Sequence, residues 1–164
     1  MKATARIATG VLALLIAHSA DAAEITRHGG ANALIHQSVV IPAGSETVLL
    51  SGLTPTPIVA GKTDSFEAFG NTKTQTIAVM ERIKAALADR GYAMSDVVKL
   101  TVFLVGDPAL GGKMDFAGMN EAYRMYFGSA DNQNLVTRST SQVAALAAPY
   151  YLVEIEATAA KAPK

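Results

Sequence analysis

The stretch from Val97 to Val105 (VVKLTVFLV) limits most strongly what this chain can fold into. Successive side chains of a strand point to opposite faces, and here both faces are apolar apart from Lys99 and Thr101. A strand with this pattern is covered on both faces, so it lies inside a sheet rather than at its edge. We therefore predict a sheet with residues 97–105 as a central strand.

Two amphipathic helices are predicted, one before and one after this strand. The first runs from about Thr72 to Arg90, and Gly91 supplies its stop signal. Its apolar side chains recur at helical spacing: Ile77, Met80, Ile83 and Leu87. Asp115 can cap a second helix that continues to Phe127. The apolar face of that helix consists of Phe116, Met119, Tyr123 and Phe127.

Four further β-rich segments complete the pattern. Residues 38–42 and 47–51 are predicted to form one hairpin, and residues 138–146 and 151–158 a second hairpin that turns around Ala147. The order β-β-α-β-α-β-β predicts an α+β fold in which two helices cover one face of a mixed sheet. Two helices cannot wrap both faces, so we expect oligomerisation to cover the other face.

The N-terminus has the pattern of a signal peptide. Lys2 and Arg6 supply positive charge, and a short apolar run follows at residues 11–17. The triplet Ala20-Asp21-Ala22 then fits the small-x-small rule for cleavage. The mature protein is therefore expected to be periplasmic or secreted, with no membrane partner once the signal peptide is removed.

The chain divides into three predicted parts. Residues 1–22 are the signal peptide, residues 23–36 an N-terminal extension, and residues 37–160 a single domain. Within the extension, residues 24–34 are expected to be a loose end, as is the C-terminal KAPK. Residues 53–70, rich in proline, glycine and threonine, are expected to form a loop.

Composition argues against several functions. The formal net charge is zero, which disfavours nucleic acid as a partner because phosphate binding normally requires a basic surface. Cysteine is absent, so there is no disulfide, no thiolate nucleophile and no cysteine-based metal site. His18 falls in the predicted signal peptide, and the remaining His28 and His36 make a poor metal site. We interpret His36, at a strand start, as structural or exposed.

Arg138 needs an explanation, because it stands at the head of a strand of small residues (NLVTRSTSQVAAL) that offers it no carboxylate. In the predicted second hairpin, Glu154 lies opposite Thr140 and shares a face with Arg138, provided that the register holds. An arginine fork suits a planar carboxylate ligand, and a nearby carboxylate can hold a water or move a proton. The alternatives are a structural salt bridge from Arg138 to Glu154 or Glu156, or side chains of Arg138 and Glu154 that both face solvent.

Other candidate site residues carry weaker signals. Asn120 lies on the second predicted helix among apolar residues, either as a polar contact or as an ordinary surface amide. Ser51-Gly52 ends a strand, where backbone N–H groups can meet a ligand or simply form a turn. Ser139 and Ser141 have no obvious histidine base, which disfavours serine-type nucleophilic catalysis.

Three stretches of the chain resemble a known family. They are DVVKLTVFLVGD, DFAGMNEAYRMYF and the pair RSTSQVAAL…YLVEIEATA, and the similarity runs from about Gln37 to Ala159. They are similar to the reactive intermediate deaminase family, also called YjgF/YER057c/UK114. The resemblance implies a chorismate-mutase-like α+β fold and a homotrimer with inward-packed sheets and three clefts between subunits. It also implies hydrolysis of enamines or imines, such as 2-aminoacrylate, to 2-keto acids and ammonia, with no cofactor.

The same resemblance assigns roles by position. Arg138 matches the arginine that grips the substrate carboxylate, and Glu154 matches the glutamate that orients the attacking water. Thr140 stands where many members carry cysteine, and its backbone would help to hold that water. The further residues that match the cleft lining are Ser51, Gly52 and Asn120.

Two positions depart from the family pattern and suggest a more apolar ligand pocket. Ile35, which remains a predicted substrate-binding residue, stands where many active members carry tyrosine, and Leu53 stands where many carry glutamine. The leading hypothesis is cofactor-free hydrolysis of a 2-imino acid, in which Arg138 anchors the carboxylate and Glu154 positions water. The rival is a non-catalytic periplasmic trimer that binds a small carboxylate or a protein partner.

Overall fold

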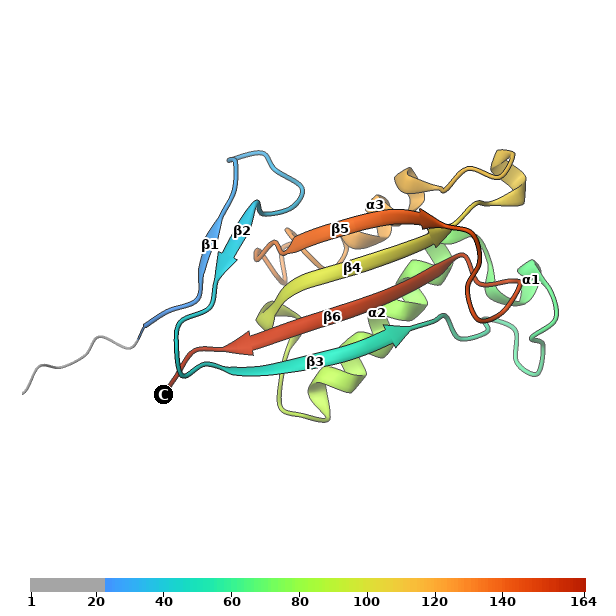
Figure 1. Ribbon diagram of the computed structural model, residues 1–164. Coiled ribbons are helices and arrows are strands. Elements are labelled where there is room, and N and C mark those ends of the chain that lie inside the picture. The colour runs from blue at the N-terminus through green and yellow to red at the C-terminus, as the bar shows by residue number, and fades with distance from the viewer. Residues whose placement is uncertain (1–22) are drawn as a thin grey trace, which may run out of the picture.

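The computed structural model describes residues 23–164 and contains a mixed four-stranded sheet (Figure 1). The strand order is β3-β6-β4-β5, with bounds Glu46–Leu53, Val153–Lys161, Val97–Val105 and Thr137–Val143. β4 runs parallel to β5 and antiparallel to β6. β4 therefore lies between two partners, which confirms the central strand predicted from its sequence. The predicted signal peptide, residues 1–22, lies outside the described residues.

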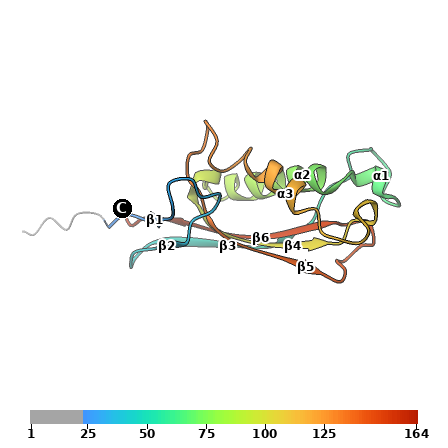
Figure 2. The same ribbon diagram turned by 90° about the horizontal axis from the view of Figure 1, so that it is seen from above.

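The helices cover one face of this sheet (Figure 2). α2 (Thr72–Ala88) and α3 (Phe116–Tyr123) form the layer, with the short α1 (Phe66–Phe69) at one end. Two 3-10 turns, η1 (Met94–Asp96) and η2 (Pro108–Leu110), precede and follow β4. Within residues 23–164, none of the helices has the length and apolar character that a membrane crossing requires. The predicted α+β fold, with both main helices on one sheet face, is confirmed.

The ends of the helices follow from local sequence signals. The Asn71 side chain caps α2 by accepting a hydrogen bond from the backbone N–H of Thr74 (3.0 Å). Asp115 caps α3 in the same way, as predicted, at 2.8 Å. Gly91, with a φ of 74°, turns the chain after α2, where a residue with a Cβ would be strained. α3 ends before the predicted Phe127, although the Phe127 side chain is buried.

The hydrophobic core lies between the helix layer and the sheet. Its fully buried side chains include Met80, Ile83 and Leu87 of α2, Met119 and Tyr123 of α3, and Leu100, Leu104 and Ile155 of the sheet. Even-numbered β4 residues therefore face the helices, and odd-numbered ones face the uncovered side. Residues that are paired on neighbouring strands point to the same face of the sheet. The alternation along β4 therefore shows which face each candidate site residue on β5 and β6 occupies.

The first predicted hairpin is wrong. β2 (Ser38–Val40) pairs antiparallel with β1 (Thr26–His28), whereas β3 pairs with β6. Residues 24–34, expected to be a loose end, supply the partner strand, so a more distant segment outcompetes the nearer one. The intervening Pro42 has no N–H for a ladder, and Gly44, at a φ of 82°, redirects the chain toward the main sheet.

Arg27 fastens the β1–β2 ribbon to the domain. Its Nη1 donates hydrogen bonds to the carbonyl oxygens of Val97 (2.9 Å) and Leu135 (2.7 Å), and its Nη2 donates to that of Ser95 (3.1 Å). One cationic side chain thus satisfies three carbonyls of the domain. Hydrogen bonds from a charged donor contribute more to stability than neutral ones, so the N-terminal ribbon is an integral part of the fold.

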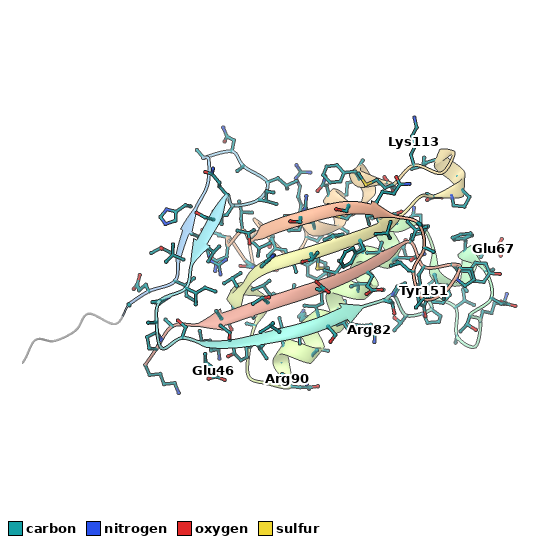
Figure 3. All side chains as sticks on the ribbon, viewed as in Figure 1. Glu46, Glu67, Arg82, Arg90, Lys113 and Tyr151 are labelled. Atoms are coloured by element: carbon teal, nitrogen blue, oxygen red, sulfur yellow. The ribbon has the colours of Figure 1, made fainter. Side chains whose placement is uncertain are left out.

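Replacing Arg27 by alanine is expected to release this ribbon. The free energy of unfolding should fall by about 1–3 kcal/mol, because the charged hydrogen bonds to partly buried carbonyls are lost. Denaturant unfolding measures the loss, and amide hydrogen exchange of residues 26–40 locates it. Arg90→Ala is the control, because Arg90 donates to Ala86 on the exposed surface of α2 (Figure 3). Equal losses in the two variants would contradict the fastening role.

The second predicted hairpin is also wrong, because β4 lies between β5 and β6 and pairs with both. The connecting segment is held by Gln75, a fully buried residue of α2. The Gln75 amide donates to the carbonyl of Tyr150 (3.0 Å) and accepts from the N–H of Leu152 (2.7 Å). Gln75 of the helix layer therefore fixes the start of β6 on the side of β4 that is opposite to β5. The sequences of the strands themselves do not indicate this contact.

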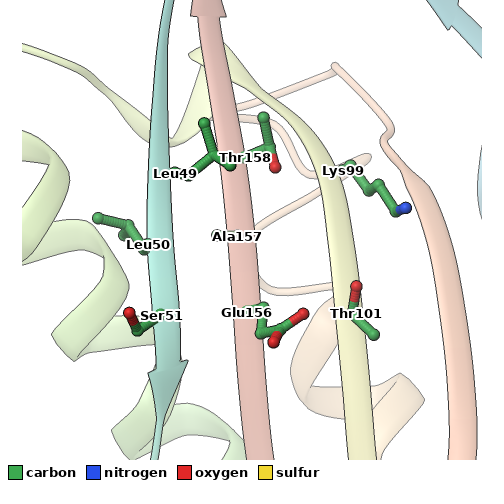
Figure 4. Close-up of a pocket in the computed structure, with 8 residues that line it drawn as sticks. All are labelled: Leu49, Leu50, Ser51, Lys99, Thr101, Glu156, Ala157 and Thr158. Carbon is green, nitrogen blue, oxygen red and sulfur yellow. The ribbon is translucent and has the colours of Figure 1, made fainter.

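The uncovered sheet face contains an open hollow of about 330 Å³ (Figure 4). Its outward-facing lining residues are Leu49, Ser51, Lys99, Thr101, Glu156 and Thr158. Leu49 is 76% exposed, which is unusual for a leucine on a sheet. The prediction that two helices leave one sheet face without cover is confirmed for the described chain.

Candidate functional site

Arg138 lies on β5 and points into the helix layer. Its Nη2 donates a hydrogen bond to Oδ1 of Asn120 (2.7 Å), and its Nη1 lies 3.6 Å from Sδ of Met119. The guanidinium carbon is 4.5 Å from the ring centre of Tyr123 and 5.8 Å from that of Phe116. These contacts hold the guanidinium by one edge and one face and leave other N–H donors unused.

Arg138 has no carboxylate partner within residues 23–164. The ion pair that this part of the chain forms, Lys73 with Glu121 at 2.8 Å, lies on the exposed helix surface. The structural salt bridge from Arg138 to a strand glutamate, left open by the sequence, is therefore not formed. Burial lowers the pKa of the Arg138 guanidinium, and Tyr123 partly offsets this, but an arginine stays protonated at neutral pH. A half-buried positive charge with free donors is suited to an organic anion.

Asn120 and Thr140 accompany Arg138. Asn120 is only 9% exposed, and its hydrogen bond orients the guanidinium. Thr140 follows on the same face of β5, and its hydroxyl is buried without a hydrogen-bond partner. An unsatisfied buried hydroxyl costs about 1–3 kcal/mol, so a ligand or a water is expected to satisfy it. Three predicted site residues thus occupy one region, called here the Arg138 half-site: Arg138, Asn120 and Thr140.

The sequence interpretation missed the aromatic wall of the Arg138 half-site. The sequence pattern places Phe116 and Tyr123 on the apolar face of a helix and hence in the core. Tyr123 is fully buried, as expected, but the Phe116 ring is 44% exposed beside the guanidinium. Phe116 and Tyr123 are two helical turns apart, so their side chains lie on the same face of α3. Asn120 lies between them in sequence, close to that face. That spacing, together with a cation on the facing strand, is the signal that could have identified the wall.

Glu154 lies on the uncovered face of the sheet, in contact with β3. A Cβ atom added to Gly52 would overlap Oε1 of Glu154 and lie 2.8 Å from its carboxyl carbon, so any larger residue here would displace the Glu154 side chain. Ser51 and Gly52 sit where the β3–β6 register shifts, between Leu50 and Leu53. Three predicted residues form this second region, called here the Glu154 half-site: Ser51, Gly52 and Glu154.

The end of β3 that carries the Glu154 half-site is tied to the helix layer. Arg82 of α2 reaches across and donates a hydrogen bond to the carbonyl oxygen of Thr54, just after β3 (Figure 3). The register shift in β3 is thus followed at once by an anchor to a rigid helix. The end of β3 beside Gly52 is therefore held by the fold rather than by a free loop.

The two half-sites do not meet within one chain, which corrects the predicted arrangement. Arg138 is in register with buried Leu100, whereas Glu154 is in register with Phe103, so their side chains leave opposite faces. The Cα atoms of Arg138 and Glu154 are two strand spacings apart across the sheet and three residues apart along the strands. The distance between these two Cα atoms is therefore about 14 Å. The physical reason is the insertion of β4, which replaces the direct pairing assumed for a hairpin.

Ile35 and Leu53, the two departures from the family pattern, border different half-sites. The backbone N–H of His36 donates to the carbonyl of Val136 (2.9 Å), which places Ile35 beside the start of β5. Leu53 ends β3 and pairs with Ile155. Both Ile35 and Leu53 are partly buried against the core. Neither side chain can hydrogen-bond a ligand, so each can offer only apolar contact.

Residues 23–164 contain no group of three histidine, aspartate or glutamate side chains that could hold a metal ion. His36 has a buried Nδ1 without a partner, and burial lowers the pKa of its imidazole. The groups that the two half-sites offer are a guanidinium, a carboxylate, an amide and two hydroxyls.

The fold and the two half-sites define a small α+β protein with a fixed arginine suited to a carboxylate ligand. A family model described as Endoribonuclease L-PSP matches residues 33–161. The chain belongs to this family, which also carries the names Rid and YjgF/YER057c/UK114. This membership confirms the resemblance noted in the sequence.

Several relatives show the same family and fold. A RutC family protein of Pyrococcus horikoshii is 41% identical over 95 residues, 56% of this chain and 64% of that protein. This match spans less than two thirds of that relative's length. The crystal structure of a putative endoribonuclease from Thermotoga maritima has 32% identity and a TM-score of 0.56, covering 82% of this chain and 92% of that one. E. coli TdcF with bound serine has 31% identity and a TM-score of 0.56, covering 82% and 94%.

Proposed function

We propose that this protein hydrolyses 2-imino acids, and their enamine tautomers, to 2-keto acids and ammonia. The observation that carries the proposal is the Arg138 guanidinium, which is half-buried, held by Asn120 and free of a carboxylate partner within residues 23–164. Such a fork fixes a substrate carboxylate through two parallel hydrogen bonds. Membership in the Rid family, whose members are commonly enamine or imine deaminases, supports the same activity.

In the proposed reaction Arg138 fixes the carboxylate and Glu154 orients a water for attack on C2. The water oxygen bonds to C2 and gives one proton to Glu154, while the C=N π electrons move to nitrogen, which takes up that proton. In the resulting carbinolamine the hydroxyl proton passes to nitrogen, the C–N electron pair leaves with nitrogen as ammonia, and the oxygen forms the C=O bond. The sum is imino acid plus water giving keto acid plus ammonia, with no oxidation. Orientation and proton transfer by the carboxylate supply the rate enhancement.

Assembly of several copies joins the two half-sites in this proposal. The Glu154 half-site faces the uncovered side, while β5, with Arg138, is the free edge strand at the opposite end of the sheet. A homotrimer with inward-facing sheets sets the Arg138 half-site of one copy beside the Glu154 half-site of the next. The exposed Leu49 and the hollow beside it support such a contact. A monomeric sedimentation mass at micromolar concentration would rule the assembly out.

The activity is tested with imino acids made in situ. An amino-acid oxidase generates the imine, catalase removes the peroxide, and semicarbazide competes by trapping the imine. The protein is expected to lower the initial rate of semicarbazone formation in proportion to its concentration, because hydrolysis removes the imine first. No effect at any concentration would reject the deaminase proposal. Calorimetric binding of 2-ketobutyrate without turnover would then favour the rival, a carboxylate-binding protein.

We also propose that the mature protein works outside the cytosol. Support comes from the positive residues, the apolar run and the small-x-small triplet in residues 1–22. Expression of the full chain in a bacterial host should give a shortened periplasmic or secreted form that begins at Ala23. Full-length protein found in the cytosol alone would contradict this location.

A further inference from the structure

The Arg138 half-site has an apolar surface that its own chain leaves partly uncovered. Met119 and Tyr123 form its buried floor, whereas the ring of Phe116 is 44% exposed. Phe116 is the first residue of α3, so its ring lies at the rim of the half-site rather than in the core. Exposed aromatic rings beside an anchoring charge are typical contacts for the apolar part of a ligand.

The position of the guanidinium limits where a bound carboxylate can lie. Tyr123 occupies one face of the guanidinium at 4.5 Å, and Asn120 occupies one nitrogen at 2.7 Å. A carboxylate must therefore approach the remaining edge, with its carbon about 4 Å from the guanidinium carbon. The Phe116 ring centre is 5.8 Å from that same carbon. A substrate side chain that extends a few bonds from C2 thus comes within contact distance of the ring.

We infer that the site prefers 2-imino acids with large apolar side chains, such as branched, thioether or aromatic ones, and that Phe116 determines this preference. The inference rests on the proposed function, because it names the substrate class of the same site. A one-carbon side chain ends before it reaches the ring, whereas a longer chain covers the exposed face of Phe116 and removes apolar surface from water. Ile35, packed beside the start of β5, adds no hydrogen-bonding group that would favour a polar side chain.

The test compares imino acids of increasing side-chain size in the semicarbazide competition. Imines from alanine, methionine, leucine and phenylalanine are generated by the same oxidase. Wild-type kcat/KM for the three large substrates should exceed that for the alanine imine at least about tenfold, as expected for apolar pocket contacts. Phe116→Ala should reduce this ratio to about 1–3, and Phe116→Leu should retain an intermediate ratio.

Met125→Ala is the matched control. Met125 is also an exposed apolar residue of the helix layer, at 55%, but it lines a different hollow together with Tyr92 and Met94. It should leave the ratio unchanged. Two outcomes would overturn the inference: a wild-type preference for the alanine imine, or a Phe116→Ala loss that is equal for all four substrates. The second outcome would mean that the ring supports the fold or a neighbouring subunit instead.

A binding measurement separates failure of this inference from failure of the proposed function. Calorimetry compares pyruvate with 4-methyl-2-oxopentanoate and phenylpyruvate on wild type and Phe116→Ala. If no imine is hydrolysed but the larger keto acids bind at least about tenfold more tightly through Phe116, the proposed function fails and the ligand class stands. Equal binding of all three keto acids overturns the ligand class, whatever the activity.

Discussion

Arg138→Ala is expected to lower kcat/KM for imine hydrolysis at least about 100-fold and to abolish calorimetric binding of 2-ketobutyrate. The variant loses both charge-assisted hydrogen bonds to the carboxylate. Arg138→Lys keeps the charge but not the planar fork, so it should recover only a small part of the affinity. The free energy of unfolding should fall by about 1–3 kcal/mol, because the buried Asn120 amide loses its hydrogen bond to Arg138, and the variant should remain folded.

Arg90→Ala is the control for the removal of a positive charge. Arg90 donates to the carbonyl of Ala86 on the exposed surface of α2, away from both half-sites. It should leave kcat/KM and ligand affinity unchanged. If Arg138→Ala instead unfolds the protein while its residual folded fraction binds 2-ketobutyrate normally, Arg138 is a structural cation and the carboxylate anchor is wrong.

Glu154→Gln is the second change with a large expected effect. It should reduce kcat by about 10²–10⁴-fold, because an amide cannot accept the proton of the attacking water. Affinity for 2-ketobutyrate should stay within a few-fold of wild type, since the carboxylate anchor is untouched. Gly52→Ala should act in the same direction, because its Cβ overlaps the Glu154 carboxylate. Steady-state kinetics and calorimetry separate these effects.

The chain provides a close control for Glu154 in Glu156, two residues further along the same face of β6. Glu156 is exposed and lines the hollow on the uncovered face, whereas the atoms nearest to a Cβ at Gly52 belong to Glu154. Glu156→Gln should therefore leave kcat almost unchanged. A loss as large as that of Glu154→Gln would mean that the assembled protein uses the uncovered face differently from the proposed reaction.

Elements with local signals could be predicted from the sequence. The two apolar faces of 97–105 gave a central strand, and Asp115 gave the start of α3 through its cap. Gly91 ended α2 through its positive φ. Each of these signals involves residues close in sequence, so no knowledge of the tertiary structure was needed.

Strand partners could not be predicted, because they depend on distant residues. Gln75 of α2 positions the start of β6 through contacts with Tyr150 and Leu152, and Arg27 fastens a ribbon that pattern alone assigned to a loose end. Both are single polar side chains that bond backbone groups far away in the sequence. Hydrophobic periodicity carries no information about such contacts.

The predicted site residues fall into two groups that the structure places in different regions, and their functional roles stay predictions. Arg138, Asn120 and Thr140 do share one region, and Ser51, Gly52 and Glu154 share another. The inserted strand β4 separates the two sets and reverses the face of one of them. A motif gives the identity of the side chains. Whether two side chains on different strands share a face of the sheet depends on the register of each strand with the strand that lies between them.

In the proposed assembly one site combines Arg138 of one copy with Glu154 of another, and mixed assemblies test this combination most directly. Arg138→Ala and Glu154→Gln chains, each inactive alone, are coexpressed with different tags, and assemblies carrying both tags are purified. In a homotrimer that contains both variants, one of the three sites combines both native residues, so about a third of wild-type activity should return. A mixture of separately purified variants should stay inactive. Mixed assemblies that are no more active than this mixture would contradict the claim.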